Sequence, residues 1–509
     1  MAPFALHHIL DLPRGGSRRS GSTPALALGS QTRTYGDLAD RAKRLARWLS
    51  IRGLGRGDRV AVLMRNNLEW FDVAFAASFA GLAWVPISYL LKTEEVEHAL
   101  KDSAVRAVFF DGETRSLLES VRRSNPHAVE HFVHVGETSP SWAHSLRRLL
   151  ETPPLFPDPS IGGDDLLQIQ YTSGTTGVPK GVVHTHSTIA WNTFQQVADF
   201  EVTPDERWLC VPSLSWAGSL HYLTLATLWA GGLVVVRPSS KVTGESIADA
   251  ISRFGITRTL LVPTILRRFV EGMERAPRFL PSLRAVFSGG ETLSLDLMER
   301  FSNIASGVEL VQTYGLSEFP ATATIMRHAS ANEKTGSVGR ASSTTALRVV
   351  DEDDLDVPPG TQGEVIIRSP SSMARYWNDP QATAQSLRGG WLWTGDLGVL
   401  DEDGLLSLNG RRKDLFISGG LNVSPAEVER IIQRHPLVRE AAVVGVPDPE
   451  WGEVGAATVV VAPEARVTVA ELVEFCRARI AHYKVPKHWH LRGQPLPRNA
   501  SGKIEKGLL

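Results

Sequence analysis

Short runs of β-branched and apolar residues alternate with helical patterns along the first half of the chain. Strand-like runs cover residues 59–64, 83–87 and 105–110, and the stretches 68–81 and 94–101 between them have the spacing of helices. This alternation of strand and helix predicts a parallel sheet covered by helices on both faces.

The same rhythm returns after a loop near residue 175. Further strands are predicted at 166–170, 208–211, 233–236, 259–262 and 285–288, and further helices at 220–229, 243–254 and from Leu293 onward. Two doubly wound sheets with a crevice between them account for this pattern, because ligands bind beyond the carboxyl ends of such strands.

The pattern changes from about Ala346. Short strands separated by Asp, Pro and Gly turns, at 347–350, 363–367 and 405–408, predict a small β-barrel-like part. A compact α+β module follows, with helices at 425–434 and 469–480 and strands at 441–446 and 457–461. We therefore expect an α/β protein with a large N-terminal domain, residues 1–410, and a small mobile C-terminal domain, residues 411–509.

Length and charge narrow the class of protein. A chain of 509 residues exceeds what one compact core supports. Lys and Arg number 54 and Asp and Glu number 55, so the balance favours neither nucleic acid nor an anionic membrane as partner.

The apolar stretches and the cysteines point to a cytoplasmic enzyme. The longest apolar run, residues 71–87, is broken by Asp72 and Pro86 and fits a buried helix leading into a strand, not a transmembrane segment. The first twenty residues contain no continuous apolar core of the kind found in secretory signals. Two distant cysteines, Cys210 and Cys476, are typical of a reducing compartment.

The strongest local motif is the loop Tyr171-Thr-Ser-Gly-Thr-Thr-Gly-Val-Pro-Lys180. It follows a strand-like run and precedes a helical pattern. Its glycines allow backbone N–H groups to approach an anion closely, and its hydroxyl groups are suited to phosphate oxygens. The spacing of a Walker-type loop is absent. Composition alone also allows a flexible Gly/Ser/Thr connector.

Four further motifs follow this loop in order. They are Tyr314-Gly-Leu-Ser-Glu318, Trp393-Thr-Gly-Asp396, Gly410-Arg-Arg-Lys-Asp414 and Pro497-Arg-Asn-Ala-Ser-Gly-Lys503. Together the five motifs resemble the adenylate-forming superfamily, which includes acyl- and aryl-CoA synthetases, luciferases and the adenylation domains of peptide synthetases. The motifs span nearly the whole chain. The resemblance implies that a carboxylic acid reacts with ATP to give an acyl-adenylate and pyrophosphate, followed by transfer of the acyl group to CoA.

The resemblance also implies roles for individual residues. Tyr314 would stack on adenine, and Glu318 would hold Mg²⁺ beside the hydroxyl of Thr172. Asp396 would accept hydrogen bonds from the ribose hydroxyls, with Arg411 reaching the ribose and phosphate side. Taken alone, Glu318 is equally a carboxylate favoured at a helix N-terminus, and Asp396 an ordinary turn former.

The complete predicted nucleotide site combines the loop with segments that would line the predicted crevice. The segment Ser288-Gly-Gly-Glu291 would line the adenine and acyl site with backbone, or else form a plain strand-to-helix turn. The predicted ATP and AMP contacts are Thr172, Ser173, Gly174, Thr175, Thr176, Gly177, Lys180, Gly289, Gly290, Glu291, Gln312, Thr313, Tyr314, Ser317, Asp396 and Arg411.

By the same resemblance, Lys503 would swing over the site and contact the substrate carboxylate and the α-phosphate. An ammonium there can neutralise charge that develops during adenylation. With Glu318 and Thr172 it forms the predicted catalytic set. Lys413 matches the hinge position, and a mobile C-terminal module would let one site carry out two reactions of different geometry.

Fewer residues support the prediction that CoA is the acceptor of the acyl group. Gly419 and Gly420 would edge a tunnel for the pantetheine arm of CoA, and Trp451, Lys484 and Lys487 would contact its nucleotide. Ordinary surface residues remain an equal alternative for the last three.

The acid pocket is predicted around Ser215, Trp216 and Gly315. Ser215 stands where many relatives have His and where amino-acid-activating relatives have Asp, so an amino acid substrate is disfavoured. The windows 212–222 and 315–323 are mostly apolar apart from His221 and Glu318, which favours a hydrophobic acid. Aliphatic and aromatic acids both remain open.

The predicted cofactors and substrates are therefore ATP, Mg²⁺, CoA and a small carboxylic acid, with no nucleic acid and no transmembrane segment. Two other hypotheses stay open: a ligase that passes the acyl group to an amine or a carrier-protein thiol, and a non-catalytic nucleotide sensor. The sequence also leaves the oligomeric state open, a homodimer included.

Overall fold

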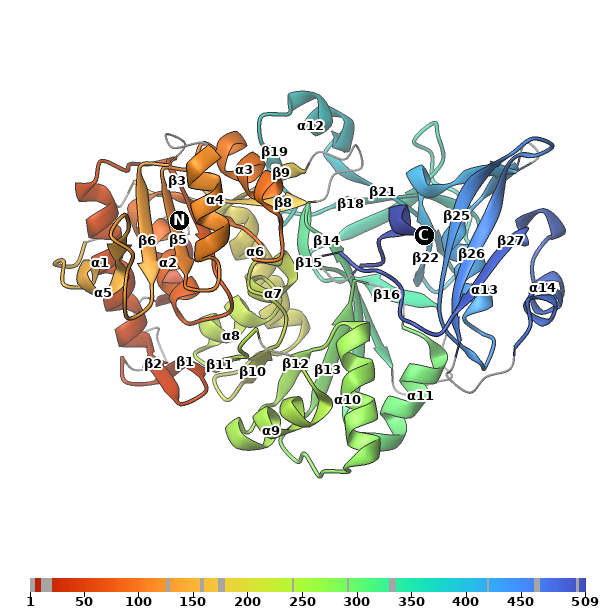
Figure 1. Cartoon of the computed structure of the whole chain (residues 1–509), viewed down its shortest axis with the longest axis horizontal. Helices are drawn as coiled ribbons and strands as arrows, with labels where there is room; N and C mark the ends of the chain where they lie inside the picture. Colours follow the sequence, from red (N-terminus) through yellow and green to blue (C-terminus); the bar gives the residue numbers. More distant parts are fainter. Residues whose placement is uncertain are drawn as a thin grey trace.

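The computed structural model describes residues 5–10, 21–124, 129–155, 160–172, 179–239, 242–290, 293–328, 336–418, 421–461, 467–499 and 503–509. Three sheets organise the chain, and Figure 1 shows the C-terminal elements gathered on the right as a separate smaller layer. The expectation of a large α/β part followed by a small α+β module is confirmed.

The first sheet has eight strands in the order β19-β9-β8-β4-β3-β5-β6-β7. These are β3 (Arg59–Leu63), β4 (Ala83–Pro86), β5 (Ala107–Asp111), β6 (His131–Val135), β7 (His144–Ser145), β8 (Leu166–Thr172), β9 (Lys180–Thr185) and β19 (Arg375–Tyr376). Its early helices are η1 (Leu6–Leu10), α1 (Tyr35–Ile51), α2 (Glu69–Ala80), α3 (Thr93–Asp102), α4 (Arg115–Ser124) and α5 (Leu146–Leu149). Strands β4, β3, β5 and β6 run parallel, as the sequence predicts.

The apolar run 71–87 forms helix α2 and strand β4, as expected. The helix ends at Gly81, whose φ of 68° is in the left-handed region that glycine adopts without strain. Asp72, which interrupts the run, is fully buried, and Arg33 and Arg41 contact it at 2.9 and 2.8 Å. The charge inside this helix is therefore paired, and the helix packs within the protein core.

The second sheet contains 14 strands, ordered β17-β18-β21-β22-β16-β15-β14-β13-β12-β10-β11-β1-β2 with β20 beside β21. Its α/β strands are β1 (Pro24–Leu28), β2 (Gln31–Thr34), β10 (Arg207–Cys210), β11 (Leu233–Val236), β12 (Arg258–Leu260), β13 (Ala285–Gly289), β14 (Glu309–Leu316) and β15 (Phe319–His328). Its helices are α6 (His186–Asp199), α7 (Ala217–Leu220), α8 (Thr224–Ala230), α9 (Gly244–Phe254), α10 (Pro263–Arg275) and α11 (Leu295–Ile304).

The barrel-like strands continue this sheet by hydrogen bonding instead of forming a sheet of their own. They are β16 (Ser337–Ala341), β17 (Ala346–Val350), β18 (Gln362–Arg368), β20 (Leu387–Arg388), β21 (Trp391–Leu400) and β22 (Leu406–Arg411), with helix α12 (Pro380–Ser386) nearby. The link is the antiparallel pairing of β14 with β15 and of β15 with β16. This hairpin therefore lies between the parallel strands and the barrel-like strands.

The C-terminal module has five strands around β26. Its elements are η2 (Arg412–Asp414), β23 (Phe416–Ser418), β24 (Leu421–Val423), α13 (Pro425–Ile432), β25 (Val438–Asp448), β26 (Gly452–Val461), α14 (Val469–Arg477), η3 (His482–Lys484), β27 (His488–Arg492) and η4 (Lys506–Leu508). The last strand of the large sheet, β22, extends through Arg411, so the two sheets are joined by the short turn that contains Lys413.

Two local predictions are wrong. The loop after β8 does not lead into a helix: β9 returns antiparallel to β8, and helix α6 begins only at His186. The expected helix at 220–229 is divided into α7 and α8, because Leu223 between them has a positive φ of 52°. Strands β8 and β9 are therefore a hairpin pair, and the residues 173–178 that connect them lie outside the described residues.

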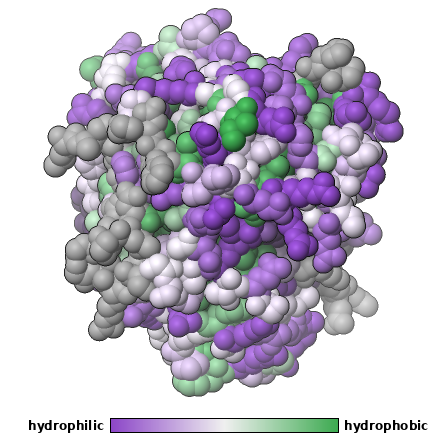
Figure 2. Space-filling view, turned by 90° about the vertical axis from the view of Figure 1, so that its left-hand side faces the viewer, coloured by the Kyte–Doolittle hydropathy of each residue, from purple (hydrophilic) through white to green (hydrophobic). Residues whose placement is uncertain are grey.

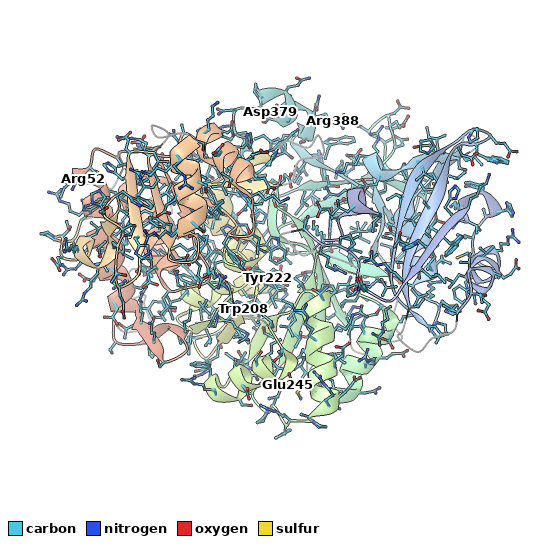
Figure 3. All side chains as sticks on the ribbon, in the orientation of Figure 1. Arg52, Trp208, Tyr222, Glu245, Asp379 and Arg388 are labelled. Carbon is cyan, nitrogen blue, oxygen red and sulfur yellow. The ribbon has the colours of Figure 1, made fainter. Side chains whose placement is uncertain are left out.

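Part of the buried core is aromatic. Trp208 and Tyr222, labelled near the centre of Figure 3, have ring centroids 6.1 Å apart, and both pack on Phe287 of β13. Cys210 and Cys476 are buried free thiols. In the part of the chain that the structure describes, no helix is long and apolar enough to cross a membrane. The face shown in Figure 2 is largely hydrophilic, with apolar residues in separate small areas.

Candidate active site

Three of the predicted nucleotide residues meet where β14 lies beside the barrel-like strands. The hydroxyl of Tyr314 donates to Oδ2 of Asp396 at 2.6 Å. Asp396 on β21 is paired directly with Arg411 on β22, and the Arg411 Nε lies 2.9 Å from Oδ1. Burial raises the pKa of Tyr314 well above its usual value, and the Asp396 charge adds to this, so the phenol stays protonated and acts as a donor.

This arrangement fixes the carboxylate of Asp396 but leaves part of its hydrogen-bonding capacity unused. Each carboxylate oxygen can accept two hydrogen bonds, and the contacts to Tyr314 and Arg411 use one position on each oxygen. One acceptor position per oxygen remains for a pair of vicinal hydroxyls. The side chain is only 9% exposed, so bonds made there are little screened by water.

Replacing Asp396 by asparagine should raise the KM for ATP about 10- to 100-fold, because a hydrogen bond to a charged group contributes about 1.5–3 kcal/mol. Initial rates of ATP–pyrophosphate exchange at varied ATP measure this. Tyr314→Phe is the matched control, since it keeps the Asp396–Arg411 ion pair and should raise the KM less. An unchanged KM in the asparagine variant would contradict the assignment.

Glu318 is positioned by a residue that sequence reasoning missed. The hydroxyl of Tyr376 on β19 donates to Oε1 of Glu318 at 2.7 Å. Burial, together with the Glu318 charge, raises the pKa of Tyr376, so this phenol also stays protonated. The only signal in the sequence is the aromatic pair Tyr376-Trp377 ahead of an Asn-Asp-Pro turn. That signal carries no chemistry until the fold brings β19 beside the β14–β15 turn.

The chemistry of Glu318 fits a magnesium site completed by substrate. Among the described residues no partner is recorded for its second oxygen, Oε2, and no group of three or more His, Cys, Asp or Glu side chains could enclose a metal. Mg²⁺ commonly uses one or two carboxylates together with phosphate oxygens and water. When bound, it would neutralise charge on the phosphates of ATP. Glu318, with the hydroxyl of Thr172 at the end of β8, would hold it.

The predicted phosphate loop lies largely outside the described residues: this applies to Ser173, Gly174, Thr175, Thr176 and Gly177.

The two ends of that loop are well defined. Thr172 and Lys180 are opposite each other at the loop end of the β8–β9 hairpin. The Lys180 ammonium lies 3.7 Å from the carboxylate of Asp379, which is labelled at the top of Figure 3, and 5.4 Å from the ring centre of Tyr376. The loop therefore begins and ends next to the segment that also orients Glu318.

A second anchor holds the same end of this hairpin. The hydroxyl of Tyr171 donates to the carboxylate of Asp102 at 2.6 Å. The carbonyl of Asp102 accepts from the Trp377 indole N–H at 2.9 Å and from the Asn378 amide at 3.0 Å. These bonds tie β8, helix α3 and the segment after β19 together. Asp102 is a second positioning residue that the sequence does not reveal.

The backbone expected to face adenine lies at the carboxyl ends of β13 and β14. These strands pair in parallel with Gly289 opposite Thr313 and Ser288 opposite Gln312. A Cβ on Gly289 would lie 2.8 Å from the Thr313 carbonyl oxygen, and Gly290 has a φ of 88°, so both positions require glycine. Glu291 lies outside the described residues.

The predicted acid wall is attached to the β8 strand. The side-chain amide of Gln170 donates to the carbonyl of Ser215 at 3.2 Å, and the Ser215 hydroxyl is 2.8 Å from that of Ser213. The Trp216 ring lies over Gly218, where an added Cβ would be 2.7 Å from ring carbons. Gly315 and Ser317 are half-buried at the β14–β15 turn. The segments predicted to surround the acid therefore contain an indole and a backbone turn.

Several of the predicted functional residues belong to the C-terminal module. Lys503 is exposed in a turn in which its N–H donates to the Asn499 side chain at 3.0 Å. Lys484 forms an ion pair with Glu427 at 2.8 Å, and the Lys487 ammonium lies 4.8 Å from the Trp451 ring centre. Gly419 and Gly420 lie outside the described residues. The roles of these groups toward CoA and the hinge role of Lys413 stay predictions.

A cleft of about 1000 Å³ separates helices α10 and α11 from helix α13 of the C-terminal module. Arg430, which lines this cleft, donates to the Asn409 side chain at 2.7 Å, and a Cβ on Gly410 would lie 3.0 Å from Ser424 and Ala426. The contact between the two parts is thus concentrated next to the turn that contains Lys413.

Two family models match the chain. The model of the AMP-binding enzyme covers residues 15–377, and that of the AMP-binding enzyme C-terminal domain covers residues 427–503. The chain belongs to the AMP-binding enzyme family. It is therefore an adenylate-forming enzyme, as the five motifs imply.

Known relatives resemble this family member over nearly its whole length. A feruloyl-CoA synthase of Amycolatopsis sp is 36% identical over 96% of both chains. An indoleacetate–CoA ligase of Aromatoleum aromaticum is 34% identical over 96% of this chain and 95% of its own. The crystal structure of an anthranilate CoA ligase with anthranoyl-AMP superposes with a TM-score of 0.90 at 27% identity, covering 99% of this chain and 96% of that one.

Other relatives use different acceptors. A fatty acid–[acyl-carrier-protein] ligase of Streptomyces coeruleorubidus is 32% identical over 95% of this chain and 92% of its own. An amide bond synthetase of Marinactinospora thermotolerans superposes with a TM-score of 0.87 at 28% identity, covering 99% of this chain and 98% of that one. Similarity over the whole chain is therefore shared by enzymes with different acceptors.

Proposed function

We propose that the protein is an AMP-forming carboxylic acid:CoA ligase acting on a hydrophobic acid. The observation that carries this proposal is that two carboxylates, each held in place by its neighbours, lie near the same guanidinium, that of Arg411. Asp396 is held by Tyr314 and Arg411, and Glu318 is held by Tyr376. One carboxylate is suited to ribose hydroxyls and the other to the metal on the phosphates, so a nucleoside triphosphate would be held at both ends.

The reaction has two steps. A carboxylate oxygen of the acid attacks the α-phosphorus of ATP, the bond to the bridging oxygen breaks, and pyrophosphate leaves. The thiol of CoA then loses its proton and attacks the acyl carbon, and AMP leaves with the electron pair of the mixed anhydride. The first step would need Lys503 close to the α-phosphate. The second would need the C-terminal module turned about Lys413 so that a thiol can enter.

The residues of the predicted acid pocket favour a flat apolar acid. The Trp216 indole lies over Gly218 and reaches to 4.0 Å from the position of a Cβ on Gly290. An aromatic side chain of this kind stacks favourably on a planar acid. Named relatives that act on feruloyl and indoleacetate groups support the same choice. The ligase would act in the cytoplasm, where ATP and CoA are available and its two buried thiols stay reduced.

The test is ATP–pyrophosphate exchange across aliphatic acids of two to eighteen carbons and a set of aromatic acids. We expect acid-dependent exchange, strongest with an aromatic acid, and formation of a thioester when CoA is added. Failure of every acid to support exchange would favour a non-catalytic nucleotide sensor.

The acceptor is tested separately. The acid that gives the strongest exchange is supplied with CoA, with a panel of free amines, or with a carrier protein bearing its pantetheine arm. A thioester with CoA as the fastest product is expected. Amide formation, or transfer only to the carrier protein, would instead place the chain with the relatives that use those acceptors.

A further inference from the structure

A mostly buried carboxylate lies on the strand next to the one that carries Asp396. Glu364 belongs to β18, which pairs with β21, and its side chain is 10% exposed. Strands β18 and β21 lie in the part of the large sheet that adjoins the C-terminal module (Figure 1). A buried carboxylate has to be paired and hydrogen-bonded, so the partners of Glu364 indicate what it does.

Strand β21 has a bulge at Asp396. The register of β18 and β21 shifts between Glu364 and Ile366, so that Val365 alone lies opposite residues 394–396 of β21. Gly395, in the middle of the bulge, has a φ of 71°, in the left-handed region. A bulge interrupts the regular ladder and re-aims side chains next to active sites. The direction of the Asp396 side chain therefore depends on the shape of this bulge.

Two side chains take up backbone groups of the bulge. The hydroxyl of Thr394 donates to the carbonyl of Val365 at 2.7 Å and accepts from the N–H of Asp396 at 3.1 Å. Oε1 of Glu364 accepts from the N–H of Gly395 at 3.1 Å. Each of the three bulge residues is thus held by a hydrogen bond, and the bond of the middle residue depends on Glu364.

The second oxygen of Glu364 is paired with an arginine. Nη1 of Arg412 donates to Oε2 at 3.1 Å. Arg412 begins the short turn that contains Lys413, and the preceding residue, Arg411, is paired with Asp396. Consecutive arginines therefore hold two carboxylates, one in the predicted ribose site and one that supports the bulge.

Arg412 has a second, weaker partner. Its Nη2 atom lies 3.5 Å from the carboxylate of Glu352, whose side chain is 90% exposed. Water and salt screen a pair with so exposed a partner, whereas the carboxylate of Glu364 is mostly withdrawn from water. Glu364 is therefore the partner that fixes the position of the Arg412 guanidinium.

We infer that Glu364 is a positioning residue of the nucleotide site: through Gly395 it keeps the Asp396 carboxylate aimed at the ribose hydroxyls, and Arg412 keeps Glu364 in place. The inference rests on the proposed function for the role of Asp396 toward the ribose. Without Glu364 the Gly395 N–H loses its acceptor, and Asp396 keeps its charge but loses its aim. The contribution of the ribose hydroxyls to nucleotide binding should then fall, and that of the rest of the nucleotide should not.

The experiment compares the Kd of ATP with that of 2′-deoxy-ATP, each measured by titration calorimetry with Mg²⁺ and without acid. For the wild-type protein we expect 2′-deoxy-ATP to bind about 10-fold more weakly, because it lacks a hydroxyl that would donate to a charged acceptor. Glu364→Met keeps the size of the side chain but removes both acceptors. In this variant the difference should fall to about threefold or less, through weaker binding of ATP.

Further variants test the route of the effect. Glu364→Gln keeps an acceptor for Gly395 and should restore part of the difference. Arg412→Gln should reduce the difference less than Glu364→Met does, and the double variant should match Glu364→Met alone, because Arg412 acts through Glu364. Glu352→Gln changes only the exposed partner of Arg412, so it is the matched control and should keep the wild-type difference.

The outcomes separate this inference from the proposed function. A wild-type difference that survives in Glu364→Met would overturn the inference, even if both nucleotides bind more weakly. Equal wild-type binding of the two nucleotides, or an effect of Arg412→Gln that adds fully to that of Glu364→Met, would overturn it as well. If Glu364→Met does not fold, Arg412→Gln decides, and an unchanged difference there would count against the inference. Exchange with no acid would overturn the proposed catalysis, whereas this comparison needs no acid.

Discussion

Replacement of Lys503 by alanine should lower acyl-adenylate formation about 100-fold or more, because one preformed donor to a developing oxyanion contributes roughly 3–4 kcal/mol. Transfer from a supplied acyl-adenylate to CoA should stay largely intact. The side chain of Lys503 is exposed, and its turn is closed by bonds between the backbone of Lys503 and Asn499 at 2.9 and 3.0 Å. Both of these bonds use the backbone of Lys503, which alanine keeps.

The two half-reactions are measured on the same preparation. Pyrophosphate exchange reports the first, and thioester formation from chemically prepared acyl-adenylate and CoA reports the second. Lys506→Ala is the matched control: this lysine lies three residues later and pairs with Glu429 at 2.6 Å on helix α13. Its loss should reduce both half-reactions little, because a half-exposed ion pair contributes about 1 kcal/mol or less. Equal loss of both half-reactions in Lys503→Ala would assign it a structural role.

Much of the α/β frame could be predicted because its strands are continuous apolar runs between recognisable helices. Strand β11 begins and ends at the predicted residues, Leu233 and Val236, and β3, β4 and β13 differ by one residue at an end. These strands are buried in a parallel sheet, so their composition alone distinguishes them. The return of the chain after β8 could not be predicted in the same way. Strand β9 is as apolar as the start of a helix, and only its pairing with β8 shows that the chain turns back.

The site could be predicted as far as its motifs reach. Tyr314, Asp396 and Arg411 lie in separate motifs, and the structure brings all three into contact. Tyr376 and Asp102 could not be found, because their importance depends on which distant residue they meet: Glu318 is 58 positions from Tyr376, and Tyr171 is 69 positions from Asp102. Residues that hold a functional group in place carry little signal of their own.

Glu318→Gln should lower kcat/KM for the adenylation step about 100-fold or more, since metal stabilisation of phosphate charge is worth several kcal/mol. Glutamine has nearly the same shape but no charge, and it can turn its amide nitrogen toward the metal. Tyr376 would still hold the other atom of the side chain, so the fold should be kept. The KM for Mg²⁺ should rise, and excess Mg²⁺ should restore part of the rate. Exchange rates across a magnesium titration measure both effects.

Tyr376→Phe tests the positioning of the Glu318 carboxylate separately from its charge. This variant keeps the charge of Glu318 and removes only the 2.7 Å hydrogen bond from Tyr376. Oε1 of Glu318 is then left to water or to the metal. Residues that orient a metal ligand typically contribute about 10- to 100-fold in metal affinity or activity. We therefore expect a smaller loss than in Glu318→Gln, rescued more completely by excess Mg²⁺. Equal losses, with no response to magnesium in either variant, would show that Glu318 acts through packing instead of through a metal.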